Sequence, residues 1–380
     1  MKTSANTLLV ALGLLFWASA ALAATPKDLR PGNDAEVIER LPERVSMAAT
    51  TPQAAEVNAR RWITLARATA DPRYLGRAQA ALSTWWDRPD APVDLMVLQA
   101  TVQQSRHEFI TAHATLERAL QLNPAHVQGW LTLATLERVA ARYSASEAAC
   151  RNVARHGAPL YAAACMLETR SLQGQQDVAR TGFTALVQQT AGDKLQRSWV
   201  LSLLAESEER AGRDDAADAL YRRSLDDAPD GYTALAYADL LLRRGQSDAV
   251  LKVLKNQPES DAVLLRRAQA LRMAGDAAWQ PLLVDLQARF AAIAARGDGL
   301  DAHARELAQL ALYLQDQPAA AWKAARTNLN LQKEPLDWLL ALQTSDRSGD
   351  APGHQAVVQA LQQSGLSDAR LARWQPKKAQ

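Results

Sequence analysis

Glycine is scarce in this sequence, with 17 among 380 residues against roughly 7% in average proteins. A surplus of one charge is missing too, because 43 Lys and Arg face 41 Asp and Glu. A nearly neutral chain lacks the basic excess that displaces phosphate counterions, so we expect no nucleic-acid partner. At 48% hydrophobic residues, the chain is not a disordered polymer. Low glycine with abundant Ala, Leu, Gln and Arg favours helices.

Motifs that mark enzymes are also missing. The sequence has no phosphate-binding P-loop, no G-x-G-x-x-G and no G-x-S-x-G. His107-Glu108 begins like the zinc-binding H-E-x-x-H, but Thr111 stands where the second His is needed. Without C-x-x-C, thiol redox chemistry is not indicated either. We therefore expect no catalytic residue, no metal, no cofactor and no enzyme activity.

Residues 1–23 have the pattern of a secretory signal peptide. Lys2 precedes an apolar core at residues 8–17, and Ala21-Leu22-Ala23 forms a cleavage site before Ala24. Cleavage there predicts a periplasmic protein with no stable membrane insertion. The alternative is that residues 8–24 remain as a membrane anchor, although this length lies at the lower limit for a span.

The strongest pattern is an internal repeat of about 34 residues. A large residue, two variable residues, Leu and Ala occur at residues 62–66 and again at 130–134, and units starting at 59, 93 and 127 share one frame. Further units start near 160, 198, 231, 261, 301 and 335. The eighth position of a unit is small in most cases, which lets two helices cross closely. These positions hold Ala66, Ala100, Ala134, Leu167, Ala205, Ala238, Ala268, Ala308 and Leu342.

This pattern resembles the tetratricopeptide repeat, a helix–turn–helix unit of 34 residues. The resemblance implies an all-α fold, a right-handed α-solenoid of about nine hairpins over residues 59–364. Residues 24–58 would add an N-terminal cap, including a helix over 28–46 with Asp34 as its N-cap, and residues 365–380 a C-terminal capping helix and polar tail. The stretches at 30–42 and 71–86 look like those of exported bacterial repeat proteins without an assigned activity. The expected helix–helix turns contain Gly174, Gly212, Gly245 and Gly275.

The two cysteines lie at equal distances from a turn at residues 156–159. Cys150 falls on the second helix of one unit and Cys165 on the first helix of the next, so an antiparallel hairpin places them at the same height. In an exported chain this spacing predicts a structural disulfide. The alternative is a pair of small buried side chains, since free Cys packs like Ala or Val.

In the tetratricopeptide family, positions 2, 5, 9, 12 and 13 of each unit face a concave groove. In the units at 160, 198 and 231 the second position is aromatic and the ninth is acidic, two helical turns away on the same face. The resemblance thus implies a groove for an extended peptide that carries Lys, Arg or amine groups. Alternatively, the rings pack between units and the carboxylates are merely solvated. The residues concerned are Tyr161, Trp199, Tyr232, Glu168, Glu206 and Asp239.

We therefore expect a non-catalytic scaffold or adaptor that binds a protein or peptide partner of the cell envelope in the concave groove. The alternative is a receptor for a small cationic or cell-wall-derived ligand in the same groove. Some members of the family hold a partner's terminal carboxylate with basic groups, but the acidic ninth positions do not favour that mode here.

Overall fold

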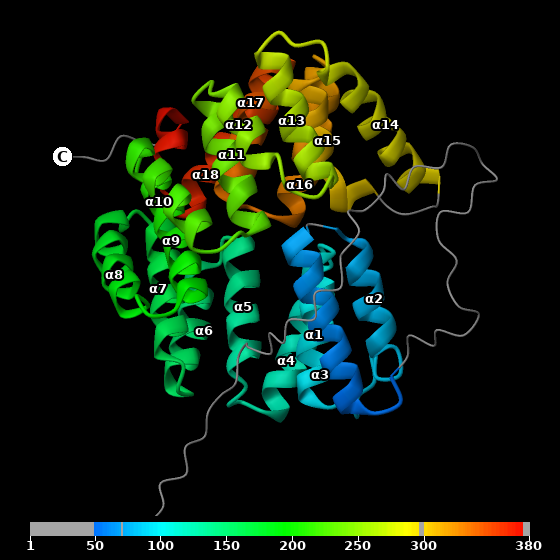
Figure 1. Cartoon of the computed structure of the whole chain (residues 1–380), viewed down its shortest axis with the longest axis vertical. Coiled ribbons are helices and arrows are strands. Elements are labelled where there is room, and N and C mark those ends of the chain that lie inside the picture. Colours follow the sequence, from blue (N-terminus) through cyan, green and yellow to red (C-terminus); the bar gives the residue numbers. More distant parts are fainter. Residues whose placement is uncertain (1–48, 70, 296–299, 375–380) are drawn as a thin grey trace, which may run out of the picture. The chain divides into compact units, whose positions relative to one another are not determined.

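The computed structural model describes residues 49–69, 71–295 and 300–374, so the predicted signal peptide and the helix expected over 28–46 lie outside the described residues. All described residues belong to one unit of the chain, residues 47–380. In this part the chain forms eighteen α-helices, two 3₁₀ helices and no strand (Figure 1). The predicted all-α fold is confirmed. None of the described helices is both long enough and apolar enough to cross a membrane.

The helices follow one another as nine hairpins. Each first helix packs against the first helix of the next hairpin, which gives the inner layer of an α-solenoid. The first helices are α1 (Pro52–Thr69), α3 (Val93–Ser105), α5 (Val127–Val139), α7 (Pro159–Leu172), α9 (Lys194–Arg210), α11 (Gly231–Arg243), α13 (Asp261–Met273), α15 (Ala304–Tyr313) and α17 (Pro335–Ser348). The second helices are α2 (Arg73–Leu82), α4 (Phe109–Leu122), α6 (Tyr143–Arg155), α8 (Gln176–Gln189), α10 (Asp214–Asp227), α12 (Ser247–Leu254), α14 (Trp279–Ala295), α16 (Pro318–Leu331) and α18 (Ala351–Ser364). The 3₁₀ helices are η1 (Leu300–His303) and η2 (Ala369–Trp374).

The small eighth positions lie where the helices of a hairpin meet. Eight of the nine are buried, and Leu167 is half-buried. At this larger residue the partner helix α8 provides Gly182, where an added Cβ would come within 2.5 Å of a Leu167 methyl carbon. Gly182 has no side chain and therefore leaves room for Leu167, which stands where most other units have Ala. Helices α7 and α8 can thus still pack closely.

The predicted glycines end the first helix of four hairpins. Gly174, Gly212, Gly245 and Gly275 have φ between 70° and 88°, the left-handed region that favours glycine. In three other hairpins a residue other than glycine has positive φ in the turn: His107, Ala141 and Asp316 adopt φ of 62°, 59° and 52°.

The last hairpins fold back onto the inner face of earlier ones. The backbone N–H of Lys333 donates to the carbonyl of Val139, and that of Ser367 to the carbonyl of Leu172, both at 2.7 Å. Val139 and Leu172 are the last residues of α5 and α7, so segments distant in sequence satisfy the free carbonyls at these helix ends. Helix α1 also packs against α11. The solenoid thus closes on itself.

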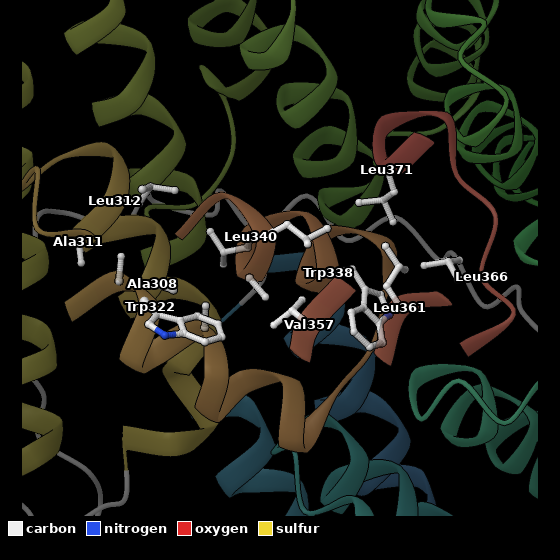
Figure 2. Packing of buried hydrophobic residues seen from close by; sticks show 14 of the residues in the cluster. Ala308, Ala311, Leu312, Trp322, Trp338, Leu340, Val357, Leu361, Leu366 and Leu371 are labelled. Carbon is white, nitrogen blue, oxygen red and sulfur yellow. The ribbon is translucent and has the colours of Figure 1, made fainter. Parts of the chain in front are cut away.

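The predicted C-terminal capping helix is the 3₁₀ helix η2, and it packs against α17 and α9 instead of only covering the last hairpin. Figure 2 shows the hydrophobic cluster that holds this region together. Trp338, Leu361 and Leu371 are at most 2% exposed within it. The cluster extends to Tyr143 at the start of α6 and to Leu172 at the end of α7. Apolar burial therefore supports the closure as well as the two backbone hydrogen bonds.

Candidate functional site

The inner layer encloses two cavities. The large inner cavity has a volume of about 720 Å³ and is lined by α1, α3, α5, α7, α9, α11 and residues 333–335. The small inner cavity measures about 270 Å³ and is lined mainly by α9, α11, α13, α15 and residues 334–336, with Arg370 of η2. Five residues border both cavities and form the wall between them. These are Glu206, Arg210, Tyr232, Glu334 and Pro335.

The concave surface is therefore not one open groove. The segment Lys333–Pro335 lies across it, held by the Lys333–Val139 backbone bond and by an ion pair of 2.6 Å between Glu334 and Arg305. The reason is the closure of the solenoid, which brings the start of the ninth hairpin to the end of α5. An extended peptide running the whole length of the inner surface would meet this segment.

The structure brings five of the six predicted groove residues together in the large inner cavity. The rings of Tyr161 and Trp199 are 5.4 Å apart at their centroids, and Trp199 and Tyr232 are 36% and 59% exposed. The sixth residue, Asp239, lines the small inner cavity. That these residues bind a partner stays a prediction. The five are Tyr161, Glu168, Trp199, Glu206 and Tyr232.

The three carboxylates at the ninth positions are not free. Each already faces an arginine of the chain, whereas we expected them to pair with cations of a ligand. Sequence reasoning missed these partners, although Arg210 stands four residues after Glu206 on the same helix, a spacing that predicts contact. The pairs are Glu168–Arg138 at 3.0 Å, Glu206–Arg210 at 3.5 Å and Asp239–Arg266 at 2.6 Å.

Two basic residues and one acidic residue of the large inner cavity form no salt bridge with another described residue, and the acidic one, Asp230, opposes the lowering of the Arg67 pKa by burial. Arg67 and Lys333 line it, and among the described residues neither takes part in an ion pair. Asp230, another lining residue, receives hydrogen bonds from the backbone N–H and the hydroxyl of Thr233. Among the described residues, each carboxylate that lines the large inner cavity thus already has a partner within the chain, which weakens its attraction for a cationic ligand.

Glu206 has a strongly perturbed environment in the wall. The pKa of its carboxyl is raised to about 7, chiefly by burial; Glu168 and Glu209 add to the rise, whereas Arg210 and the hydroxyl of Tyr232 oppose it. Its Oε1 is buried and accepts no hydrogen bond, and the Nη2 of Arg210 is buried and donates none. The nearby negative charge of Glu206 raises the pKa of Tyr232 well above its usual value.

A polar cluster that the sequence analysis did not identify fixes the segment across the cavity. Arg305 of α15 binds both Glu334 and Asp337, and Asn328 donates to Asp337 at 2.6 Å. Burial raises the pKa of Asp337 to about 6, although Arg305 opposes this effect. Glu334 and Asp337 form a capping box at the start of α17. Their spacing of three residues is the sequence pattern from which this part of the cluster could have been predicted. Within the described residues, no group of His, Cys, Asp and Glu is arranged to hold a metal ion.

The expected disulfide is present beside the large inner cavity. Cys150 of α6 and Cys165 of α7 are bonded with their Cα atoms 5.7 Å apart, and Cys165 lines the cavity. A crosslink that closes a loop of this length contributes about 3 kcal/mol by restricting the unfolded chain. The disulfide therefore holds α6 against α7, the helix that lines the large inner cavity.

Comparison with known proteins gives similarity of fold. Neither a protein-family profile nor a curated protein matches this chain. The Cut9–Hcn1 hetero-tetramer of the APC/C is similar in structure with a TM-score of 0.51 at 12% identity, over 86% of this chain and 62% of that one. A tetratricopeptide repeat protein from Parabacteroides merdae matches with a TM-score of 0.38 at 12% identity, over 77% and 99%. Pseudomonas aeruginosa pilF matches with a TM-score of 0.38 at 15% identity, over 53% and 93%.

At these identities the likeness concerns the fold alone. The chain has the fold of an α-solenoid of the tetratricopeptide-repeat type, as its sequence predicts. Solenoids of stacked repeats present extended concave surfaces that are used for binding.

Proposed function

We propose that this chain is a non-catalytic scaffold or adaptor of the periplasm that binds a segment of a partner protein in the large inner cavity. The observation that carries the proposal is the gathering of Tyr161, Trp199 and Tyr232 on one cavity wall. Aromatic side chains left accessible in a cavity provide contact area at low entropic cost. Leu195, which is 64% exposed, adds apolar surface to the same wall.

The dividing segment at 333–335 limits the form of the bound partner. A cavity of about 720 Å³ lies within the range of about 300–1,000 Å³ that binds small ligands. We therefore expect a chain end or a loop of the partner to enter, instead of a long peptide that lies along the whole solenoid. The positive charges of Arg67 and Lys333 favour a partner segment that is neutral or acidic.

Photocrosslinking in the native host tests this proposal. A benzophenone amino acid replaces Leu195 at the cavity wall, and in a matched variant it replaces Ile110, which is 89% exposed and borders neither cavity. We expect position 195, and not position 110, to capture one envelope protein, and Trp199→Ala to abolish the capture. Equal capture from both positions, or capture that survives Trp199→Ala, contradicts binding in the large inner cavity.

The cavity volume also favours a second candidate, a receptor for a small cell-wall-derived ligand. A ligand of this kind would be retained as an added mass in native mass spectrometry of protein purified from its host. The added mass would be absent in Trp199→Ala. Position 195 would then capture no protein, which separates this candidate from the scaffold.

A further inference from the structure

The wall between the two cavities contains a carboxyl group whose ionised form is only partly compensated. Nη1 of Arg210 lies 3.5 Å from Glu206 Oε2, and Oε1 of Glu206 is buried without a hydrogen-bond partner. The equivalent carboxylate one hairpin further along is better held, because Arg266 donates to both oxygens of Asp239 at 2.7 and 2.6 Å. A buried carboxylate that accepts few hydrogen bonds favours its protonated form. Glu206 is therefore the better candidate for a group that changes its charge near neutral pH.

The ionisable groups that face Glu206 come from four helices. Negative neighbours add to the effect of burial, because a proton on Glu206 relieves the repulsion among carboxylates. Helix α8 and η2 also pack against α9, but Arg180 of α8 binds Glu208 and Arg370 of η2 binds Glu209. The facing groups are Arg210 and Glu209 of α9, Glu168 of α7, Tyr221 of α10 and Tyr232 of α11, with Glu334 beside Tyr232.

Tyr232 connects this carboxyl group to the aromatic wall of the large inner cavity. Its hydroxyl interacts with the Glu206 carboxylate, while its side chain lines the cavity and is 59% exposed. A ring that is exposed to this extent has few packing neighbours, so the contact of its hydroxyl determines where it lies. Hydrogen bonds to a charged acceptor are roughly twice as strong as those between neutral groups. Protonation of Glu206 therefore weakens the contact and lets the ring adopt other rotamers.

We propose that Glu206 is a proton-controlled positioning residue of the large inner cavity, whose ionised form holds the ring of Tyr232 in the aromatic wall and whose protonated form releases it. This inference rests on the proposed function and adds regulation by pH to it. The pKa of Glu206 is about 7, so the ionised form predominates above pH 7. Binding of a neutral partner segment should therefore strengthen as the pH rises through 7.

Carbon NMR of the full chain, labelled with ¹³C at the ε carbons of tyrosine, tests the positioning without any ligand. Tyr232→Phe assigns the Tyr232 signal. Between pH 5 and pH 9 we expect this signal to move between two positions with a midpoint near pH 7, and to lie closer to its value in the unfolded chain at the acidic end. The pKa of Tyr232 is raised well above its ordinary value, so its own titration does not contribute.

Three variants identify the group that titrates. Glu206→Gln resembles the protonated form, which the unmodified chain already adopts near neutral pH, so it should fold and keep the Tyr232 signal at its acidic position throughout. Glu168→Gln removes a negative neighbour that raises the pKa of Glu206, so the transition should remain but move to lower pH. The matched control, Asp239→Asn, alters the ninth position of the next hairpin and should keep the midpoint near pH 7.

Photocapture from position 195 extends the test to binding. In permeabilised host cells buffered at pH 8 and at pH 6, we expect about two- to tenfold more capture at pH 8, because a ring that is already positioned need not be ordered on binding. The difference should disappear in Glu206→Gln.

The outcomes separate the inference from the proposed function. If the Tyr232 signal stays constant between pH 5 and pH 9, or moves equally in Glu206→Gln, the inference is wrong while the proposed function stands. Equal capture at both pH values would show that the position of Tyr232 does not regulate binding, which also overturns the inference. If position 195 captures no protein at either pH, the proposed function is contradicted, and the NMR titration alone decides whether Glu206 positions Tyr232.

Discussion

At the scale of single residues, the acidic side chains at the ninth positions of the inner layer form ion pairs with arginines of the same chain. Glu168, Glu206 and Asp239 each face an arginine, and of these three pairs only Glu206–Arg210 contains fully buried side-chain atoms without a hydrogen-bond partner. The seven-residue spacing predicted that each carboxylate shares a helix face with an aromatic residue, and the resemblance to the tetratricopeptide repeat implied that this face is the inner one. The partner of Asp239 could not be predicted so simply, because Arg266 belongs to the next hairpin and its contact depends on how the hairpins stack.

Glu206 should make the stability of the protein depend on pH. Its pKa rises from an ordinary 4.5 in the unfolded chain to about 7 in the folded one, so its contribution is fully present below pH 4.5 and is lost as the pH rises through 7. With about 1.4 kcal/mol for each tenfold change in proton affinity, the loss approaches about 3 kcal/mol. Glu206→Gln should remove this loss. In urea unfolding, the free energy of unfolding of the variant should therefore increase relative to that of the unmodified chain between pH 4 and pH 8.

Glu208, two residues further along α9, provides a control of opposite sign. It is also buried, but hydrogen bonds from Arg213 and Arg180 outweigh the effect of burial and lower its pKa. Its contribution is therefore present at pH 8 and is lost as the pH falls through its folded pKa, and Glu208→Gln should lose stability relative to the unmodified chain at pH 8. Parallel pH curves for the unmodified chain and Glu206→Gln would show that Glu206 is not perturbed.

At the scale of helices, the repeat predicts where two helices meet but not how an exception is accommodated. The Ala positions were readable because the crossing of two helices recurs at a fixed place in each unit. Leu167 departs from the pattern, and its compensation by Gly182 requires the alignment of α7 and α8 to be known. The turns at His107 and Ala141 could not be predicted either, because no clear sequence pattern marks a residue other than glycine that adopts positive φ.

Alanine substitutions at two helical glycines should have opposite effects. Gly76→Ala in α2 has open space around the new methyl group and should stabilise the protein by about 0.5–1 kcal/mol through helix propensity. Gly182→Ala should destabilise it by about 1 kcal/mol, because Leu167 must leave its rotamer. Thermal unfolding measures both, and adding Leu167→Ala to Gly182→Ala should relieve the clash. An equal gain from both single substitutions would mean that α7 and α8 are not closely packed.

At the scale of the whole unit, the closure was beyond sequence reasoning. It depends on the curvature summed over nine hairpins, and it is made by backbone groups of Lys333 and Ser367, which have no distinctive residue type. The aromatic wall could be predicted because it lies on neighbouring hairpins in one register. The division of the inner surface into two cavities could not, because its cause lies more than a hundred residues away along the chain.

Ser367→Pro tests the closure directly. It removes the N–H that binds the carbonyl of Leu172 and should cost about 1–3 kcal/mol by leaving that carbonyl unsatisfied. We expect faster hydrogen exchange in residues 366–374 and in α9, together with a broader unfolding transition. Ser367→Ala keeps the N–H and should behave like the unmodified chain. Unchanged exchange in Ser367→Pro would mean that η2 is held by its other contacts alone.

The hydrogen bond between Lys333 and Val139 also has a consequence for the time at which the large inner cavity forms. An open array of repeats can fold one unit after another, because its contacts are local. Here the cavity wall lacks residues 333–335 until the start of the ninth hairpin has joined the end of α5, about 190 residues earlier in the chain. Contacts across so long a stretch of sequence are slow to form. Binding competence should therefore be the last property that the newly made chain acquires, after its individual hairpins have folded.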